Sequence, residues 1–216
     1  MAENWGGLLD RVHLQLPATL LIVFFIPSNL ARLLLLCIAW LCLFWPLHKK
    51  ELIAFLVINI IFTINNHMAI QNGIFQFAEP DLFLLPYFEF VMWGFYLIHS
   101  HRVVKPKWPQ SWKAGPIILT VLFSMCFSLS PNQDILLYSS STVILLSTAI
   151  YRNKNAIQLG LYMIVLGALI EYFGVYFQLW NYPKPYPGGV AFWFATLWYG
   201  VGFYYYFILG PYYNDK

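Results

Sequence analysis

Apolar residues run along this chain in long stretches from one end to the other. Turn residues and charges divide its 216 residues into eight apolar segments. These segments cover residues 12–27, 30–46, 52–72, 82–100, 115–130, 134–151, 157–179 and 190–209. A perpendicular membrane span needs about 20 apolar residues, so the first, second and fifth segments are short for spans. The pattern predicts an all-α integral membrane protein with about eight transmembrane helices.

Composition supports the same class. Hydrophobic residues make up 60% of the chain, charged residues make up 10%, and the mean hydropathy is +0.64. These values lie far outside the range of soluble globular proteins. Because no long polar segment could form a separate soluble core, we expect one membrane domain.

The basic residues predict the orientation of the spans. If eight spans alternate, one side receives ten basic residues and the other receives two, Arg32 and Lys184. The ten are Arg11, Lys49, Lys50, Arg102, Lys105, Lys107, Lys113, Arg152, Lys154 and Lys216. The positive-inside rule then predicts a multi-pass protein with both termini in the cytoplasm. The net charge of +3 reflects this topology, so we expect contacts with membrane lipid headgroups and no nucleic-acid partner.

An internal repeat is indicated by a shift of 105 residues. This shift lays the third segment on the seventh and the fourth on the eighth, and the first two on the fifth and sixth. Asn66 then meets Glu171, and Trp93 meets Trp198. We predict two four-helix repeats, residues 1–105 and 106–216, which together form one membrane domain. An even number of spans makes the copies parallel, with a site between them near their common axis.

Two carboxylates, Glu89 and Glu171, remain inside apolar segments once the other acidic residues are assigned to loops and ends. An acidic residue is costly in a membrane and is a functional candidate by default. We therefore take Glu89 and Glu171 as candidate catalytic residues. For Glu89 an equally simple interpretation is that it faces interfacial water.

Polar side chains lie near both carboxylates. On the third segment Asn59 and Asn66 share one helical face, and His67 lies beside it. On the seventh segment Gln178 lies near a stripe of glycines, which lets helices approach closely. We expect these four side chains to bind substrate in one polar pocket. The alternative is that each amide links neighbouring helices by a hydrogen bond.

Aromatic residues make up 20% of the chain, and several flank the two carboxylates. The candidates for substrate binding are Tyr87, Phe88, Trp93, Tyr172, Tyr176 and Trp180. Ring faces stabilise a developing cation, and a buried carboxylic acid can supply a proton. This combination favours acid-initiated chemistry on an isoprenoid alkene.

Two stretches resemble a known family. GIFQF followed by LLPYFEFVMWGF, and EYFGVYFQLWNY in the second copy, resemble the membrane-embedded lycopene cyclase domain, which occurs duplicated. The resemblance implies that Glu171, Trp180 and Tyr182 match the acid and the aromatic element of that family. It also implies that Pro86 and Glu89 match the proline and the second glutamate of its P-x-E-E motif.

The chain departs from that family at four positions. Phe88 replaces the first glutamate of the motif, and Asn66 replaces the acid of the first copy. Ala191 and Phe194 replace the proline and the glutamate of the second copy. These departures leave open a different ring closure, an isomerase, or no catalysis.

The leading hypothesis is a membrane enzyme, a terpenoid cyclase or isomerase, that protonates a lipidic isoprenoid. Glu171 would be the general acid and Glu89 its partner, with Asn66 and His67 orienting them. We expect no soluble cofactor because there is no glycine-rich phosphate loop, and no metal because no paired ligand spacing occurs. The alternatives are a proton-coupled transporter and a non-catalytic helper subunit; the sequence does not predict an oligomeric state.

Overall fold

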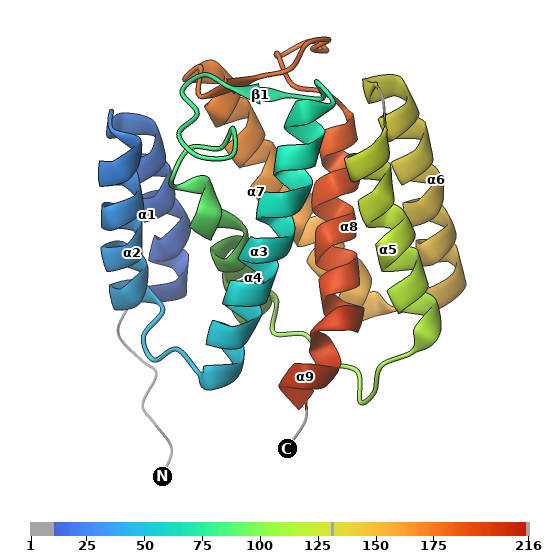
Figure 1. The fold of residues 1–216 in the computed structure, drawn as a ribbon. Helices are drawn as coiled ribbons and strands as arrows, with labels where there is room; N and C mark the ends of the chain where they lie inside the picture. Colours follow the sequence, from blue (N-terminus) through green and yellow to red (C-terminus); the bar gives the residue numbers. More distant parts are fainter. Residues whose placement is uncertain (1–10, 131, 215–216) are drawn as a thin grey trace.

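The computed structural model describes residues 11–130 and 132–214, which form a bundle of helices (Figure 1). The helices are α1 (Arg11–Phe25), α2 (Asn29–Leu43), α3 (Lys49–Gln71), α4 (Glu89–Val104), α5 (Ala114–Leu129), α6 (Gln133–Tyr151), α7 (Lys154–Tyr176), α8 (Trp193–Ile208) and the short α9 (Gly210–Asn214). Two short strands, β1 (Gln76–Phe77) and β2 (Trp180–Asn181), pair antiparallel at one end of the bundle. The eight longer helices follow the eight apolar segments of the sequence.

Three of these helices are long and apolar enough to cross a bilayer, by length and composition, within the described part of the chain. They are α3, α6 and α7. The helices α1, α2 and α5 are also apolar but have only 15 or 16 residues. The surface is correspondingly rich in exposed aliphatic side chains, including Leu21, Ile38 and Leu145. Such a surface is suited to lipid, which has no hydrogen bonds to offer.

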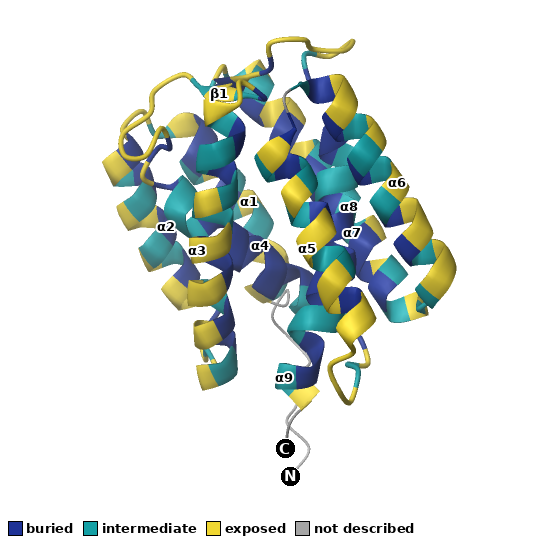
Figure 2. Cartoon of the chain, turned by 45° about the vertical axis from the view of Figure 1, so that its right-hand side comes forward, coloured by how far each residue is buried: buried dark blue, intermediate teal, exposed yellow. Residues whose placement is uncertain are grey.

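The packing of α7 against α8 forms the centre of the bundle. Gly160, Gly167 and Gly174 on α7 lie so close to aromatic rings that a methyl group at any of them would overlap a ring. At Gly167 the ring is the indole of Trp198, and at Gly174 it is the indole of Trp180. The buried faces of α4, α7 and α8 meet in the interior (Figure 2). The helix α4 therefore lies against helices that are distant from it in the sequence. The three glycines of α7 therefore leave room for aromatic rings to pack against the helix.

The segment before α4 is not helical, so the predicted start of this helix was wrong. Residues 82–88 were expected in a helix with Glu89 well inside it, but α4 begins at Glu89 and the residues before it form a loop. The loop is held by Asp81, whose Oδ2 accepts hydrogen bonds of 2.9 Å from the backbone N–H of Tyr87 and from Nδ2 of Asn29. Pro86 disfavours helix at the residue before it. Glu89 therefore lies in the first turn of α4, where a carboxylate interacts favourably with the helix dipole.

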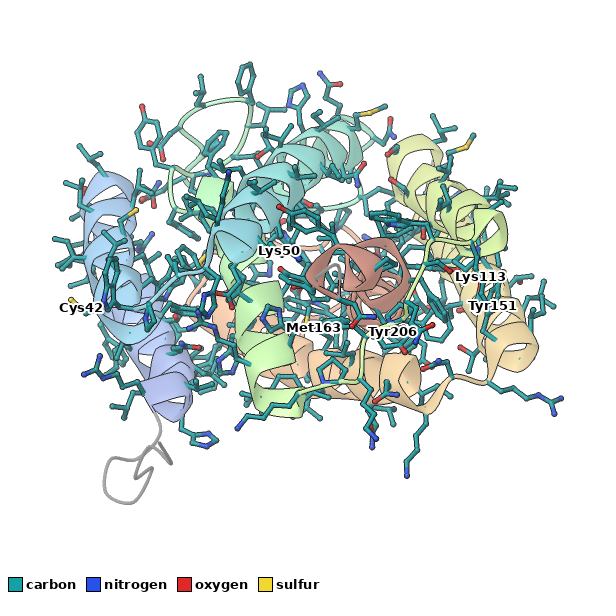
Figure 3. All side chains as sticks on the ribbon, turned by 90° about the horizontal axis from the view of Figure 1, so that it is seen from below. Cys42, Lys50, Lys113, Tyr151, Met163 and Tyr206 are labelled. Atoms are coloured by element: carbon teal, nitrogen blue, oxygen red, sulfur yellow. The ribbon has the colours of Figure 1, made fainter. Side chains whose placement is uncertain are left out.

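The opposite end of the bundle is fastened by Glu51 in the first turn of α3. Arg102 on α4 donates to both carboxylate oxygens of Glu51, at 2.8 and 2.6 Å, and His101 lies 3.1 Å from Oε1. Arg102 also donates to the carbonyl oxygen of Phe44, at 2.9 Å. Seen from this end, side chains fill the interior around Met163, which is fully buried (Figure 3). The ion pair thus links α3, α4 and the chain that follows α2.

We predict that Glu51→Ala lowers the free energy of unfolding by about 3 kcal/mol, because Arg102 is left partly buried without its carboxylate. The measurement is the thermal unfolding midpoint of the purified protein in detergent. Asp134→Ala is the control: Asp134 is exposed in the first turn of α6, so only its dipole interaction is lost, worth at most about 1 kcal/mol. Equal effects of the two substitutions would contradict the prediction.

Candidate functional site

A small cavity lies near β1 and β2, between α3, α4, α7 and α8. Its volume is about 50 Å³. Its lining residues are Val23, Asn66, Phe75, Phe77, Phe88, Glu89, Met92, Trp93, Tyr96, Ile170, Glu171, Trp180, Tyr182, Trp193, Leu197 and Trp198. Both predicted carboxylates therefore face one cavity, and the rest of the lining is mostly aromatic and aliphatic.

Glu171 on α7 is buried and accepts hydrogen bonds at both carboxylate oxygens. Oε1 accepts from Nε1 of Trp198 on α8, at 3.0 Å. Oε2 accepts from Nε1 of Trp180 on β2, at 3.0 Å, and from the hydroxyl of Tyr182. The indole N–H can only donate, so all of these contacts suit a carboxylate that accepts. Glu171 therefore joins α7, β2 and α8 through one buried group.

Glu89 on α4 uses a single oxygen in its contacts. Its Oε1 accepts from Nδ2 of Asn66 on α3, at 2.9 Å, and from Nε1 of Trp93 one turn along α4, at 3.0 Å. The Trp93 ring stacks on Phe62 at 4.1 Å between centroids and lies 4.7 Å from the ring of Trp198. This packing holds the indole so that its N–H reaches Glu89. Asn66 thus forms a hydrogen bond with the second predicted carboxylate.

Neither Glu89 nor Glu171 forms an ion pair with a basic residue among the described residues. The ion pairs within residues 11–130 and 132–214 involve Glu51, with Arg102 and His101, at the other end of the bundle. The positive partners of Glu89 and Glu171 are therefore partial charges on indole, amide and hydroxyl groups. A buried polar group is tolerated when its hydrogen bonds are made, and these donors meet that requirement. The described residues also contain no cluster of three side chains that could hold a metal ion.

Three predicted binding residues belong to α3 or to the end of α7 and lie outside this cavity. Asn59 accepts a 2.8 Å hydrogen bond from the backbone N–H of Gly94 and so links α3 to α4. His67 donates from Nδ1 to the carbonyl oxygen of Phe83 in the loop before α4, at 2.8 Å. Gln178 is exposed in the turn that ends α7, where its φ is 58°. Asn59 thus links two neighbouring helices by a hydrogen bond, which was the alternative interpretation of this side chain.

Three predicted aromatic residues also point away from the cavity. Tyr87 is partly exposed in the loop before α4, and Tyr172 is 42% exposed and packs edge-on against Phe194. Tyr176 is 79% exposed at the end of α7. Phe88, Trp93 and Trp180 do line the cavity. The helical spacing explains the difference, because Tyr172 and Tyr176 lie on the face of α7 opposite Gly167 and Gly174.

Sequence reasoning missed several residues of the site. Tyr182 was noted only for a family resemblance, and Trp198 only as the repeat partner of Trp93, yet both donate to Glu171. Tyr96 and Trp193 were not singled out, although both line the cavity. Trp198 could have been found from the internal alignment, which places it opposite Trp93.

A larger apolar groove adjoins the cavity between α3, α5 and α8, whose ribbons lie side by side in Figure 1. Its volume is about 160 Å³. It shares Asn66, Phe75, Trp193 and Leu197 with the carboxylate cavity. These residues form the wall between a small polar cavity and a larger apolar groove.

Comparison with known proteins gives one structural relationship. No family model matches the chain, and no curated protein matches it. Among solved structures, the chain is similar to MvINS, a mycobacterial Insig homologue from Mycobacterium vanbaalenii, with a TM-score of 0.65 and 16% identity. The match covers 77% of this chain and 95% of MvINS. A cross-linked trimer of a cysteine variant of MvINS matches equally, with a TM-score of 0.65 and 15% identity.

These findings correct the leading hypothesis drawn from the sequence. The prediction of a proton-initiated isoprenoid cyclase or isomerase is wrong, because the matching structures are those of an Insig homologue. The resemblance to the lycopene cyclase domain gains no support, since no family model matches. The prediction of an all-α integral membrane protein is confirmed: the chain has a fold similar to that of the mycobacterial Insig homologue MvINS.

Proposed function

We propose that this protein is a non-catalytic membrane helper, which acts by associating with membrane lipid and with other membrane protein chains. One observation carries the proposal: both oxygens of Glu171 are occupied by three donors of the same chain. A general acid must direct a proton from its carboxyl oxygen to a substrate. Glu171 instead directs both oxygens at indole N–H groups and a hydroxyl.

The size of the carboxylate cavity supports this proposal. Its volume is about 50 Å³, and a cavity needs about 10–15 Å³ on this measure to hold one water molecule. The space between Glu89 and Glu171 is about one third of a cavity of about 150 Å³ that holds benzene, so it has room for a few waters and not for an isoprenoid chain. Its walls are indole and phenyl rings packed at centroid distances of 4.7 to 6.3 Å, such as Trp93 on Trp198 and Phe75 near Tyr182.

Association with other chains is supported by the MvINS comparison. A cysteine variant of that protein was crystallised as a cross-linked trimer, and this chain has a similar fold. Exposed aliphatic side chains also cover the outer faces of α2, α5 and α6, which could meet lipid or a neighbouring membrane protein. The transporter alternative stays a prediction.

A duplicated architecture remains part of the proposal. It is supported by element bounds: α3 and α7 both have 23 residues and begin 105 residues apart, at Lys49 and Lys154. The helices α4 and α8 both have 16 residues and begin 104 residues apart, at Glu89 and Trp193. We infer two parallel copies with the cavity between them. In Figure 1, α1 begins at the same end of the bundle as α9, as expected if both termini are cytoplasmic.

We predict that Glu171→Gln destabilises the fold, whereas Glu89→Gln does not. A glutamine at 171 turns an N–H₂ group toward a donor, either Trp198 or the pair Trp180 and Tyr182, and should lower the free energy of unfolding by about 2–3 kcal/mol. A glutamine at 89 keeps one oxygen for both of its donors, so its cost should stay below about 1 kcal/mol. Thermal unfolding in detergent, followed by tryptophan fluorescence, measures both.

The two variants control one another because they make the same substitution in the same cavity. Equal stability of Glu171→Gln and wild type would contradict the assigned role of Glu171. Conversion of a membrane lipid by the wild-type protein, lost in a fully stable Glu171→Gln variant, would overturn the non-catalytic proposal itself.

A second prediction concerns association. Native mass spectrometry of the protein released from its own membranes should show oligomers or a complex with another membrane protein, rather than monomer alone. Monomer at every lipid-to-protein ratio, with no copurifying protein, would contradict the proposal. Dilution of the sample into excess phosphatidylcholine nanodiscs controls for association caused by crowding in detergent micelles.

A further inference from the structure

The groove between α3, α5 and α8 has the features of a binding site for an apolar molecule. Its lining is entirely uncharged, and most of it is aliphatic or aromatic. A cavity of about 150 Å³ lined by apolar side chains stays free of water and binds small apolar molecules, and this groove measures about 160 Å³. Val57 and Ile61, which belong to its rim, are 43% and 48% exposed on α3. An apolar chain can therefore enter from the surrounding lipid.

An unused hydrogen-bond donor marks one end of this groove. Trp193 is only 4% exposed and lines both the groove and the carboxylate cavity, yet its indole N–H has no acceptor within the described residues. The other three indoles around the cavity, those of Trp93, Trp180 and Trp198, all donate to Glu89 or Glu171. A buried donor without an acceptor is rare in native proteins and points to a missing partner.

A second donor lies on the same groove. Asn65 on α3 uses its Oδ1 to accept from the hydroxyls of Ser124 and Ser128 on α5, at 3.2 and 3.1 Å. Its Nδ2 donates to none of the described residues. Two side chains of the groove, those of Trp193 and Asn65, thus have hydrogen atoms to donate.

The charges around the groove define the class of occupant. An anionic headgroup would meet no basic side chain in the lining and would lie beside Glu89 and Glu171. A cationic headgroup would meet donors rather than acceptors at Trp193 and Asn65. An uncharged group with an acceptor oxygen, a hydroxyl or a carbonyl, fits both the donors and the absence of charge.

We propose that the groove between α3, α5 and α8 binds an uncharged membrane lipid through its hydroxyl or carbonyl oxygen, which accepts a hydrogen bond from the indole N–H of Trp193. The apolar part of the lipid lies along the groove and continues into the bilayer past Val57 and Ile61. This inference rests on the proposed function, because it names the lipid class and the site through which the helper would bind lipid.

The test uses a photoreactive fatty alcohol with a mid-chain diazirine and a terminal alkyne, added to the protein in phosphatidylcholine nanodiscs. The matched probes are an alkane and a fatty acid of the same length with the same diazirine. We expect the alcohol to label peptides of α3, α5 and α8 more strongly than either matched probe, and excess unlabelled fatty alcohol to compete. Labelling by the alkane at the same level would overturn the proposal.

Two variants separate the hydrogen bond from the shape of the groove. Trp193→Phe keeps a ring and removes the N–H, and should reduce alcohol labelling about five-fold, the effect of one lost hydrogen bond. Trp45→Phe is the matched control, because Trp45 is 67% exposed and lies outside the groove. Wild-type labelling of a folded Trp193→Phe variant would refute the role of its N–H.

Thr120→Phe tests the groove without touching Trp193. Thr120 lines the groove from α5, and a phenyl group there should block labelling of the groove peptides. Undiminished labelling of this variant would overturn the site even if Trp193→Phe failed to fold. Native mass spectrometry of the same samples distinguishes the two proposals. A protein that is monomeric but still labelled in the groove counts against the helper function alone. A protein that associates with other chains but is not labelled in the groove counts against the lipid site alone.

Discussion

The burial of a carboxylate in an apolar helical bundle is the constraint on which this fold depends. A buried acceptor is stable only if donors reach it, and Glu171 receives them from β2 and α8 as well as from Tyr182. These donors require α7 and α8 to lie in contact, which Gly167 permits by leaving room for the indole of Trp198. One hydrogen-bonding requirement thus determines which helices are neighbours at the centre of the molecule.

The two glutamates of the cavity, which look alike in the sequence, have different environments. Glu171 lies on a long helix and is surrounded by donors at both oxygens, whereas Glu89 begins a helix and engages Oε1 alone. Asn66 occupies the position that aligns with Glu171, and its amide donates to Glu89. The two aligned positions thus hold an amide, which donates, and a carboxylate, which accepts. The hydrogen bonds of the site therefore need no basic residue.

Indole rings carry most of the polar contacts of this site, and this choice has a physical basis. An indole offers one N–H donor on a large apolar ring, so it can satisfy a carboxylate while filling space between helices. Trp93, Trp180 and Trp198 do both. Trp193 has the same packing without an acceptor, and it stands where the carboxylate cavity meets the apolar groove. Within the described residues, the contrast separates three indole donors that are engaged by the carboxylates from one that is free where the cavity meets the groove.

The sequence by itself determined the membrane class, the eight helical segments and the two acidic candidates, Glu89 and Glu171, whereas the tertiary structure places both at one cavity. The length and hydropathy of the apolar segments suffice for the membrane class and the helices, because a bilayer requires long apolar runs. The two glutamates are indicated because an acidic residue inside such a run is rare and costly. Only the tertiary structure decided that Tyr172, Tyr176 and Gln178 point outward and that Trp198 donates to Glu171. Helical spacing determines which residues share a face, whereas the packing of α7 on α8 and the loop before α4 determine what each face meets, and those contacts join residues far apart in the chain.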